Sequence, residues 1–155
     1  HRVGQIADRR EAGHARTDRD FRGRLMLVYF GFTFCPDVCP TDLQAIGLAL
    51  DRLGPDGDQV QPIFITVDPE RDTASHLADY VPMFHPRLIG LTGSADAIRK
   101  VADAYKVYYA RVPQDAGASR RNSRWTRCVA RISAFTGNWR AGERARHGKV
   151  GLRAM

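Results

Sequence analysis

Apolar and polar residues follow two different periods in the middle of the chain, and together these periods predict strands separated by helices. The continuous apolar runs at 25–32 (LMLVYFGF) and 60–67 (VQPIFITV) are typical of buried strands. Pro62 places the start of the second strand at an edge or a bulge, because proline has no amide hydrogen to donate. Between them, residues 41–54 have apolar side chains every three or four positions and end in glycine, so they predict a helix.

The same alternation continues through the next fifty residues. A helix is expected from Thr73, a suitable N-cap, and Pro82 should kink or end it. Residues 87–93 predict a third strand, 94–105 a helix that begins at a serine N-cap, and 106–112 a fourth strand. Strands separated by helices in this way indicate an α/β domain with a sheet that is at least partly parallel.

Both ends of the chain lack such a period, and the charge is concentrated at one of them. Residues 1–117 carry 14 Lys and Arg against 16 Asp and Glu, whereas residues 118–155 carry 10 Lys and Arg against a single Glu. The formal net charge of +7 therefore belongs to the tail. Because the tail lacks the repeated aromatic and basic interleaving of nucleic-acid platforms, we expect no specific nucleic-acid partner.

Two cysteines stand at the junction of the first strand and the first helix, in the stretch YFGFTFCPDVCPTDL. If Pro40 is the first helical residue, Cys39 is the N-cap, where free backbone N–H groups would lower the pKa of its thiol. The nearby Asp37 and Asp42 oppose a bare thiolate but favour a bound cation. Cys35 and Cys39 are separated by a loop wide enough for both sulfurs to face one ion.

The residues alone leave the role of this pair open among a metal site, a redox pair and simple packing. Two thiolates suit Cu(I) or a thiolate-rich zinc site. Structural zinc requires four ligands, and no second Cys or His pair stands out in the sequence. Cu(I) therefore fits better than zinc, and Cu(II) fits if a histidine joins the site.

Three collinear motifs, YFGFTFCPDVCPTDL, FITVDPERDT and FHPRLIGLTG, resemble those of the SCO/SenC family. These proteins are thioredoxin-like copper chaperones that help to assemble the copper centre of cytochrome c oxidase. The resemblance implies a thioredoxin-like α/β fold with a central mixed sheet flanked by helices, over residues 17–117. It leaves residues 1–16 as an atypical N-terminal segment and 118–155 as an atypical basic tail. We hypothesise that neither end is native to the family. A shifted reading frame in the coding DNA would produce such ends. Translating the gene in all three frames tests this hypothesis.

The resemblance also implies roles for individual residues. Cys35 and Cys39 match the copper ligands of the family and would form its redox pair. Asp37 and Asp68 are expected to stabilise the metal-binding loop without binding the metal, or to contribute to partner docking. His85 matches a family histidine that does not bind metal, and the same is expected of His76.

The third copper ligand of the family, a histidine in an acid-His-Ser motif, is not found. Residues 123–128 read SRWTRC where that motif should fall. His147 is the remaining downstream candidate, although it matches nothing in the family pattern, and Cys128 could supply a third sulfur.

These observations predict a metallochaperone rather than an enzyme, with copper as Cu(I) and Cu(II) as the second form. The alternative function is a thiol-disulfide oxidoreductase acting on cysteines of an oxidase subunit or of a copper chaperone. A third hypothesis is that the chain keeps the fold but no longer functions, and that its basic tail binds polyanions nonspecifically. The family implies a monomer whose partner is the copper-site subunit of the oxidase or another copper chaperone. It also implies a place on the periplasmic side of the bacterial inner membrane, held by an anchor that this chain does not contain.

Overall fold

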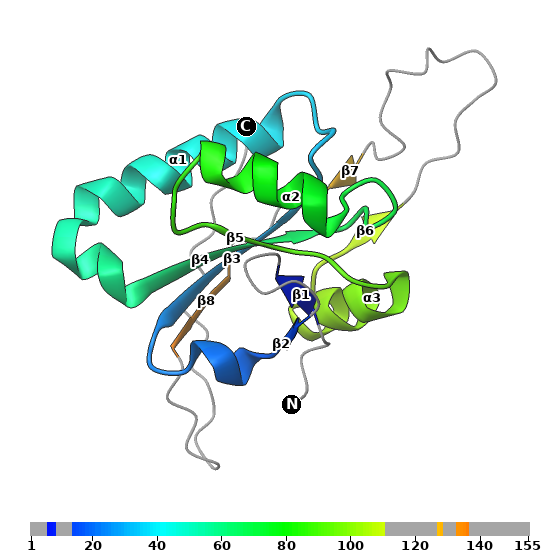
Figure 1. Ribbon diagram of the computed structural model, residues 1–155, viewed down its shortest axis with the longest axis horizontal. Coiled ribbons are helices and arrows are strands. Elements are labelled where there is room, and N and C mark those ends of the chain that lie inside the picture. Colours follow the sequence, from blue (N-terminus) through cyan, green and yellow to red (C-terminus); the bar gives the residue numbers. More distant parts are fainter. Residues whose placement is uncertain (1–5, 9–13, 111–126, 129–132, 137–155) are drawn as a thin grey trace.

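The computed structural model describes residues 6–8, 14–110, 127–128 and 133–136, and its centre is a sheet in the order β5-β4-β3-β8 (Figure 1). The strands β3 (Leu25–Gly31) and β4 (Val60–Thr66) run parallel over their whole length. On the far side of β4, β5 (Ile89–Leu91) is also parallel, whereas β8 (Ser133–Thr136) runs antiparallel to β3. The sheet is therefore mixed, as the sequence predicts.

Helices cover both faces of this sheet. The helices α1 (Val38–Leu53) and α2 (Ala74–Tyr80) lie on one side and α3 (Ala95–Ala104) on the other (Figure 1). Short 3-10 turns connect these elements at η2 (Asp18–Phe21), η3 (Gly54–Gln59) and η4 (Val81–Met83). No helix in the described ranges has the length and apolar character needed to cross a membrane.

The predicted helix boundaries on α2 and α3 are confirmed by their caps. The hydroxyl of Thr73 accepts the backbone N–H of His76 at 3.2 Å, and that of Ser94 accepts the N–H of Ala97 at 3.2 Å. Each cap satisfies an amide that has no partner within its own helix. The helix α2 ends at Tyr80, just before the turn that contains Pro82, as the proline requires.

The two faces of the strands form separate cores. On the α3 side, alternate residues of β3 and β4 pack against helical side chains, and this cluster includes Met26, Val28, Phe30, Ile63, Ile65, Ile98 and Val101. On the side of α1 and α2, the remaining positions pack with Tyr29, Phe64, Leu43, Ile46, Leu50 and Leu77. Burial on both faces explains why these strands read as continuous apolar runs.

Two strand predictions need correction. The predicted strand at 87–93 is reduced to β5, and the one predicted at 106–112 begins only with β6 (Tyr109–Ala110), while residues 111–112 lie outside the described residues. Moreover, β6 pairs with β7 (Arg127–Cys128) and not with the central sheet. Pro62 lies near the start of β4, opposite Leu27 and before the stretch that pairs with β5, so it stands at an edge on that side, as predicted. Its missing amide hydrogen therefore costs no bond to β5.

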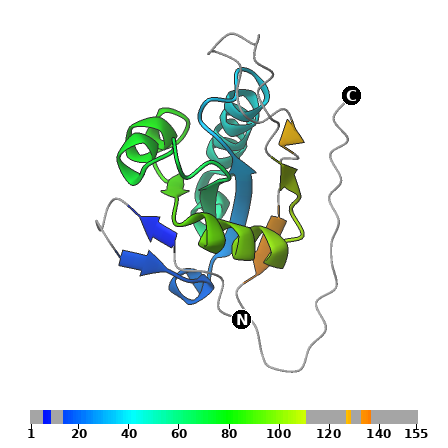
Figure 2. The ribbon, with the colours of Figure 1, turned by 90° about the vertical axis from the view of Figure 1, so that its right-hand side faces the viewer.

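The ends of the chain, where no period was found, also contribute strands. The strand β8 comes from the basic tail and lies beside β3, on the side of the sheet away from α2 (Figure 2). At the other end, β1 (Ile6–Asp8) and β2 (His14–Arg16) form an antiparallel hairpin. The spacing of apolar residues predicts neither β8 nor this hairpin.

Candidate metal centre

The two cysteines lie where the carboxyl ends of the parallel strands β3 and β4 meet. Cys35 is in the loop that follows β3, and Cys39 is in the first turn of α1. The loop after β4, residues 67–73, adjoins them, and the backbone N–H of Val67 donates to the carbonyl of Gly31 at 2.8 Å. Crevices at this end of parallel strands are the usual ligand sites of α/β sheets.

The sulfurs of Cys35 and Cys39 are both free thiols, with unequal exposure. Cys35 is half-buried, whereas Cys39 is 1% exposed. The backbone N–H of Cys39 donates to the Cys35 sulfur at 3.4 Å, and the N–H of Cys35 donates to the carbonyl of Phe32 at 3.2 Å. The loop therefore closes as a turn that brings the Cys35 sulfur over the start of α1.

The expected position of Cys39 at the helix N-cap is wrong. The helix starts at Val38, with Asp37 at the N-cap, so Cys39 and Pro40 are its second and third residues. Proline is tolerated there because the first four amides of a helix have no intrahelical acceptor. Burial raises the pKa of Cys39 to about 12, the opposite of the predicted lowering, because the charged thiolate is disfavoured away from water.

Gly31 makes the close packing around Cys39 possible. A Cβ atom at Gly31 would lie 3.0 Å from the Cys39 sulfur and 2.9 Å from Cε1 of Tyr29. Both distances are shorter than the contacts that Cβ atoms normally make. The glycine at the end of β3 therefore lets the sulfur rest directly against the backbone of the strand.

The carboxylates predicted near the site have different surroundings. Asp37 is exposed, and Asp42 accepts a hydrogen bond from the hydroxyl of Tyr29 at 3.0 Å. Asp68 is 2% exposed and forms an ion pair with the guanidinium of Arg71. Arg71, whose side chain is 28% exposed, lies next to the exposed Glu70, so this loop presents both charges near the surface.

The sequence reading missed Asp72, which is fully buried beside the cysteine loop. Its carboxylate accepts hydrogen bonds from the backbone N–H and the hydroxyl of Thr33 and from the hydroxyl of Thr66. The only sequence signal was a second aspartate in DPERDT, which on its own predicts a turn.

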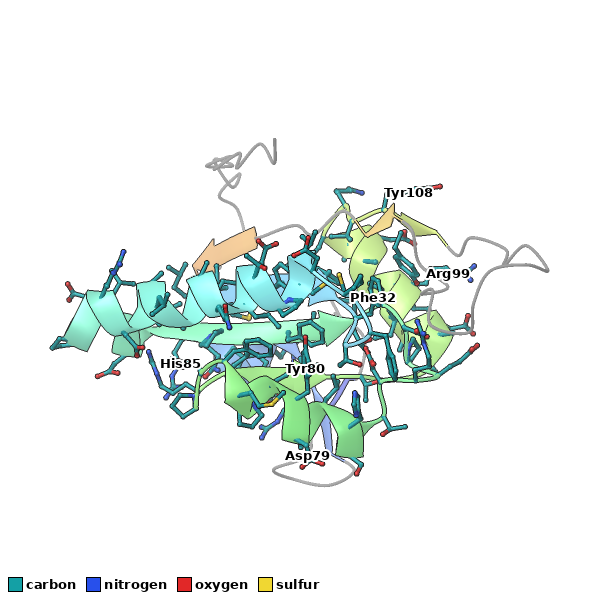
Figure 3. All side chains as sticks on the ribbon, turned by 90° about the horizontal axis from the view of Figure 1, so that it is seen from above. Phe32, Asp79, Tyr80, His85, Arg99 and Tyr108 are labelled. Atoms are coloured by element: carbon teal, nitrogen blue, oxygen red, sulfur yellow. The ribbon has the colours of Figure 1, made fainter. Side chains whose placement is uncertain are left out.

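A row of rings borders the cysteine loop. Phe34, 52% exposed, stacks on His76 with ring centres 5.8 Å apart, and His76 stacks on Tyr80 at 6.3 Å. The guanidinium of Arg71 lies 4.7 Å from the centre of the Phe34 ring, within the range of a cation–π contact. Burial, followed by the charge of Cys39 as a thiolate, raises the pKa of Tyr80 to about 12. Figure 3 shows Tyr80 on α2 and Phe32 near the loop.

The side chains of His85 and His76 each contact a residue other than the two cysteines. His85 is buried near the far end of α1, where its Nε2 lies 3.4 Å from Asp51 (Figure 3). His76 is engaged by Thr33, with its Nε2 at 2.9 Å from the hydroxyl oxygen. Among the described residues, no three His, Cys, Asp or Glu side chains come close enough to hold a metal ion. His147 and the Cys128 side chain lie outside the described residues.

The donor set that remains is two thiols, one in the loop before α1 and one in the first turn of that helix. Such a pair suits a soft cation of low coordination number, and both sulfurs must lose their protons when it binds. The same pair can form a disulfide, in which the half-buried Cys35 is the sulfur that a partner thiol can reach.

The chain is similar in sequence to proteins of one known family. The family model of SCO1/SenC matches residues 9–125. The mitochondrial SCO2 homolog of Bos taurus is 52% identical over 105 residues, which cover 66% of this chain and 40% of that protein. A SCO2-like protein of Rickettsia prowazekii is 50% identical over 94 residues, covering 61% of this chain and 46% of the relative. The chain thus spans less than half the length of these curated relatives.

Solved structures agree with the fold. The structure of Bradyrhizobium japonicum ScoI with copper bound is 38% identical and superposes with a TM-score of 0.67, covering 86% of this chain and 76% of that one. Yeast Sco1 with copper bound is 31% identical, with a TM-score of 0.69 over 86% and 72% of the two chains. The predicted thioredoxin-like α/β fold is thereby confirmed. The chain belongs to the SCO1/SenC family.

Proposed function

We propose that this protein is a copper metallochaperone that holds Cu(I) between the thiolates of Cys35 and Cys39. It would pass the ion by ligand exchange to a copper site of cytochrome c oxidase or to another copper chaperone. The observation that carries the proposal is the pair of free thiols at the end of β3, joined by the N–H of Cys39 donating to the Cys35 sulfur. The copper-bound structures of the relatives from Bradyrhizobium japonicum and yeast support the choice of metal.

Two sulfurs alone favour the reduced ion. Cu(I) is soft and accepts two thiolate ligands, whereas Cu(II) gains strongly from an imidazole. Asp37, exposed at the start of α1, and the carboxylate of Asp42 add negative charge near the sulfurs. A third ligand from His147 or Cys128 remains a prediction, as do the supporting roles of Asp37 and Asp68.

An anaerobic titration of the reduced protein with Cu(I), in competition with a coloured Cu(I) chelator, tests the proposal. We expect one equivalent of Cu(I) to be withheld from the chelator and Cu(II) to bind much more weakly. The variants C128S and H147A are expected to retain the Cu(I) site, because neither residue is needed for a two-thiolate clamp. A wild-type protein that releases all of its Cu(I) to the chelator contradicts the proposal.

The unequal exposure of the cysteines favours thiol-disulfide exchange as a second function. In that reaction the thiolate of Cys35 attacks a partner disulfide, one partner thiol leaves, and a mixed disulfide forms. Cys39 then attacks Cys35, which releases the second partner thiol and leaves the Cys35–Cys39 disulfide.

This second function predicts that C39S traps a mixed disulfide with an oxidised test peptide, whereas C35S forms none. Gel electrophoresis without reductant measures the adduct. Equal trapping by both variants would show that exposure does not select the attacking sulfur.

The family also supports a proposal for location and partner. We infer that the domain works on the periplasmic side of a bacterial inner membrane, as a monomer, and that it serves a copper-site subunit of the oxidase. Arginine outnumbers lysine 21 to 3, as in proteins of GC-rich bacterial genomes, which supports a bacterial source.

A further inference from the structure

The side chain of Asp72 has no exposed surface, and its two carboxylate oxygens accept three hydrogen bonds. One oxygen, Oδ2, accepts the backbone N–H of Thr33 at 3.0 Å and the hydroxyl of Thr66 at 2.6 Å. The other oxygen, Oδ1, accepts the hydroxyl of Thr33. Burying a carboxylate is costly unless such bonds replace its water, so the position of Asp72 is tied to these partners.

The partners of Asp72 lie at the end of β4 and in the turn before Cys35. Thr66 is the last residue of β4, and Thr33 is the second of four residues in the turn that closes between Phe32 and Cys35. Asp72 therefore binds this turn through both the backbone N–H and the hydroxyl of Thr33. Only Phe34 separates Thr33 from Cys35 in the sequence.

The hydrogen atoms of this network can be assigned from the contacts. The hydroxyl of Thr33 has one proton, and it goes to Asp72. The contact of 2.9 Å between the Thr33 oxygen and Nε2 of His76 must therefore use a proton carried by that nitrogen. The exposed imidazole of His76 thus reports on the state of Thr33 and, through it, of Asp72.

We propose that Asp72 is a positioning residue for the cysteine pair and that it acts through Thr33. By fixing the turn before Cys35, it holds the Cys35 sulfur over the start of α1, where the Cys39 sulfur lies. The conformational freedom of the loop is then lost on folding rather than on metal binding. This inference rests on the proposed function for its copper readout, but its other readouts need no metal.

The test compares T33V, which removes only the hydroxyl, with T33S, which keeps it. We expect the Cu(I) affinity of T33V and of D72N to fall about tenfold, the effect of one hydrogen bond to a charged group, and that of T33S to stay near the wild type. In the metal-free protein, the equilibrium constant for closing the Cys35–Cys39 disulfide in a glutathione buffer should fall by a similar factor. That change corresponds to a reduction potential raised by about 30 mV.

A second readout separates positioning from simple support of the fold. In D72N the amide nitrogen would face Thr33 and donate to its oxygen, so the Thr33 hydroxyl would turn its proton toward His76. We expect the nitrogen-15 NMR signals of His76 to show the proton on Nε2 in the wild type and on Nδ1 in D72N. A role limited to packing would leave this tautomer unchanged.

Several outcomes would overturn the inference. If T33V matches T33S in both the Cu(I) affinity and the disulfide constant, Asp72 does not act through Thr33. If D72N does not fold, the pair of Thr33 variants still decides. A wild-type protein that holds no Cu(I) overturns the proposed copper function, and the disulfide constant then decides the role of Asp72 by itself.

Discussion

Replacing Cys39 by serine is expected to weaken Cu(I) binding by more than about 100-fold, since losing even an outer partner of a metal ligand costs about 10- to 100-fold. Serine has nearly the shape of cysteine but offers a hard, protonated oxygen that Cu(I) does not favour. The same loss is expected for C35S. Competition with a Cu(I) chelator under anaerobic conditions measures both variants.

Because Cys39 is 1% exposed, its replacement also buries a hydroxyl. The variant A102S provides a matched control, since Ala102 is also 1% exposed but lies on α3, in the other core. It should lower the free energy of unfolding by a comparable amount and leave Cu(I) binding unchanged. Wild-type affinity in both C35S and C39S would show that these sulfurs are not the ligands.

Replacing Gly31 by alanine is expected to lower both stability and Cu(I) affinity. The added methyl group would meet Tyr29 at 2.9 Å and the Cys39 sulfur at 3.0 Å, so the side chains must move. Overpacking of this kind costs about 1–3 kcal/mol of unfolding free energy. Urea denaturation of the metal-free protein gives the stability, and chelator competition gives the affinity.

The variant G47A separates these two effects. A Cβ atom at Gly47 would lie 2.5 Å from the carbonyl oxygen of Phe84, so this variant is also overpacked, but in a place remote from the sulfurs. We expect G47A to lose stability and to keep its Cu(I) affinity. If the two variants weaken copper binding equally, the contact between Gly31 and Cys39 has no special part in the site.

The sequence predicted those features that depend on neighbouring residues. The apolar run of β3 and the caps at Thr73 and Ser94 are local, and the structure has them where expected. With Pro40 as its first residue, α1 is predicted to start two residues late, because proline fits any position in the first helical turn and thus marks the start of a helix only to within a turn.

Features that depend on distant partners could not be predicted in this way. Thr33 and Asp72 are 39 residues apart, and nothing in either segment alone indicates that they meet. The strand β8 has four residues and depends on its pairing with Leu25–Val28 at the other end of the chain. For the cysteine pair, periodicity indicated the junction of strand and helix, whereas the choice of copper came from the resemblance of the motifs.

The position of β8 has a consequence for synthesis of the protein on the ribosome. The strand β3 receives its parallel partner once Val60–Thr66 have been made, but its other edge stays open until Ser133–Thr136 have left the ribosome. An open edge on an apolar strand is a template for pairing with other chains. The nascent chain therefore passes through a stage in which the strand that leads to Cys35 is already formed but exposed to aggregation, and it is closed only by a segment near the carboxyl end.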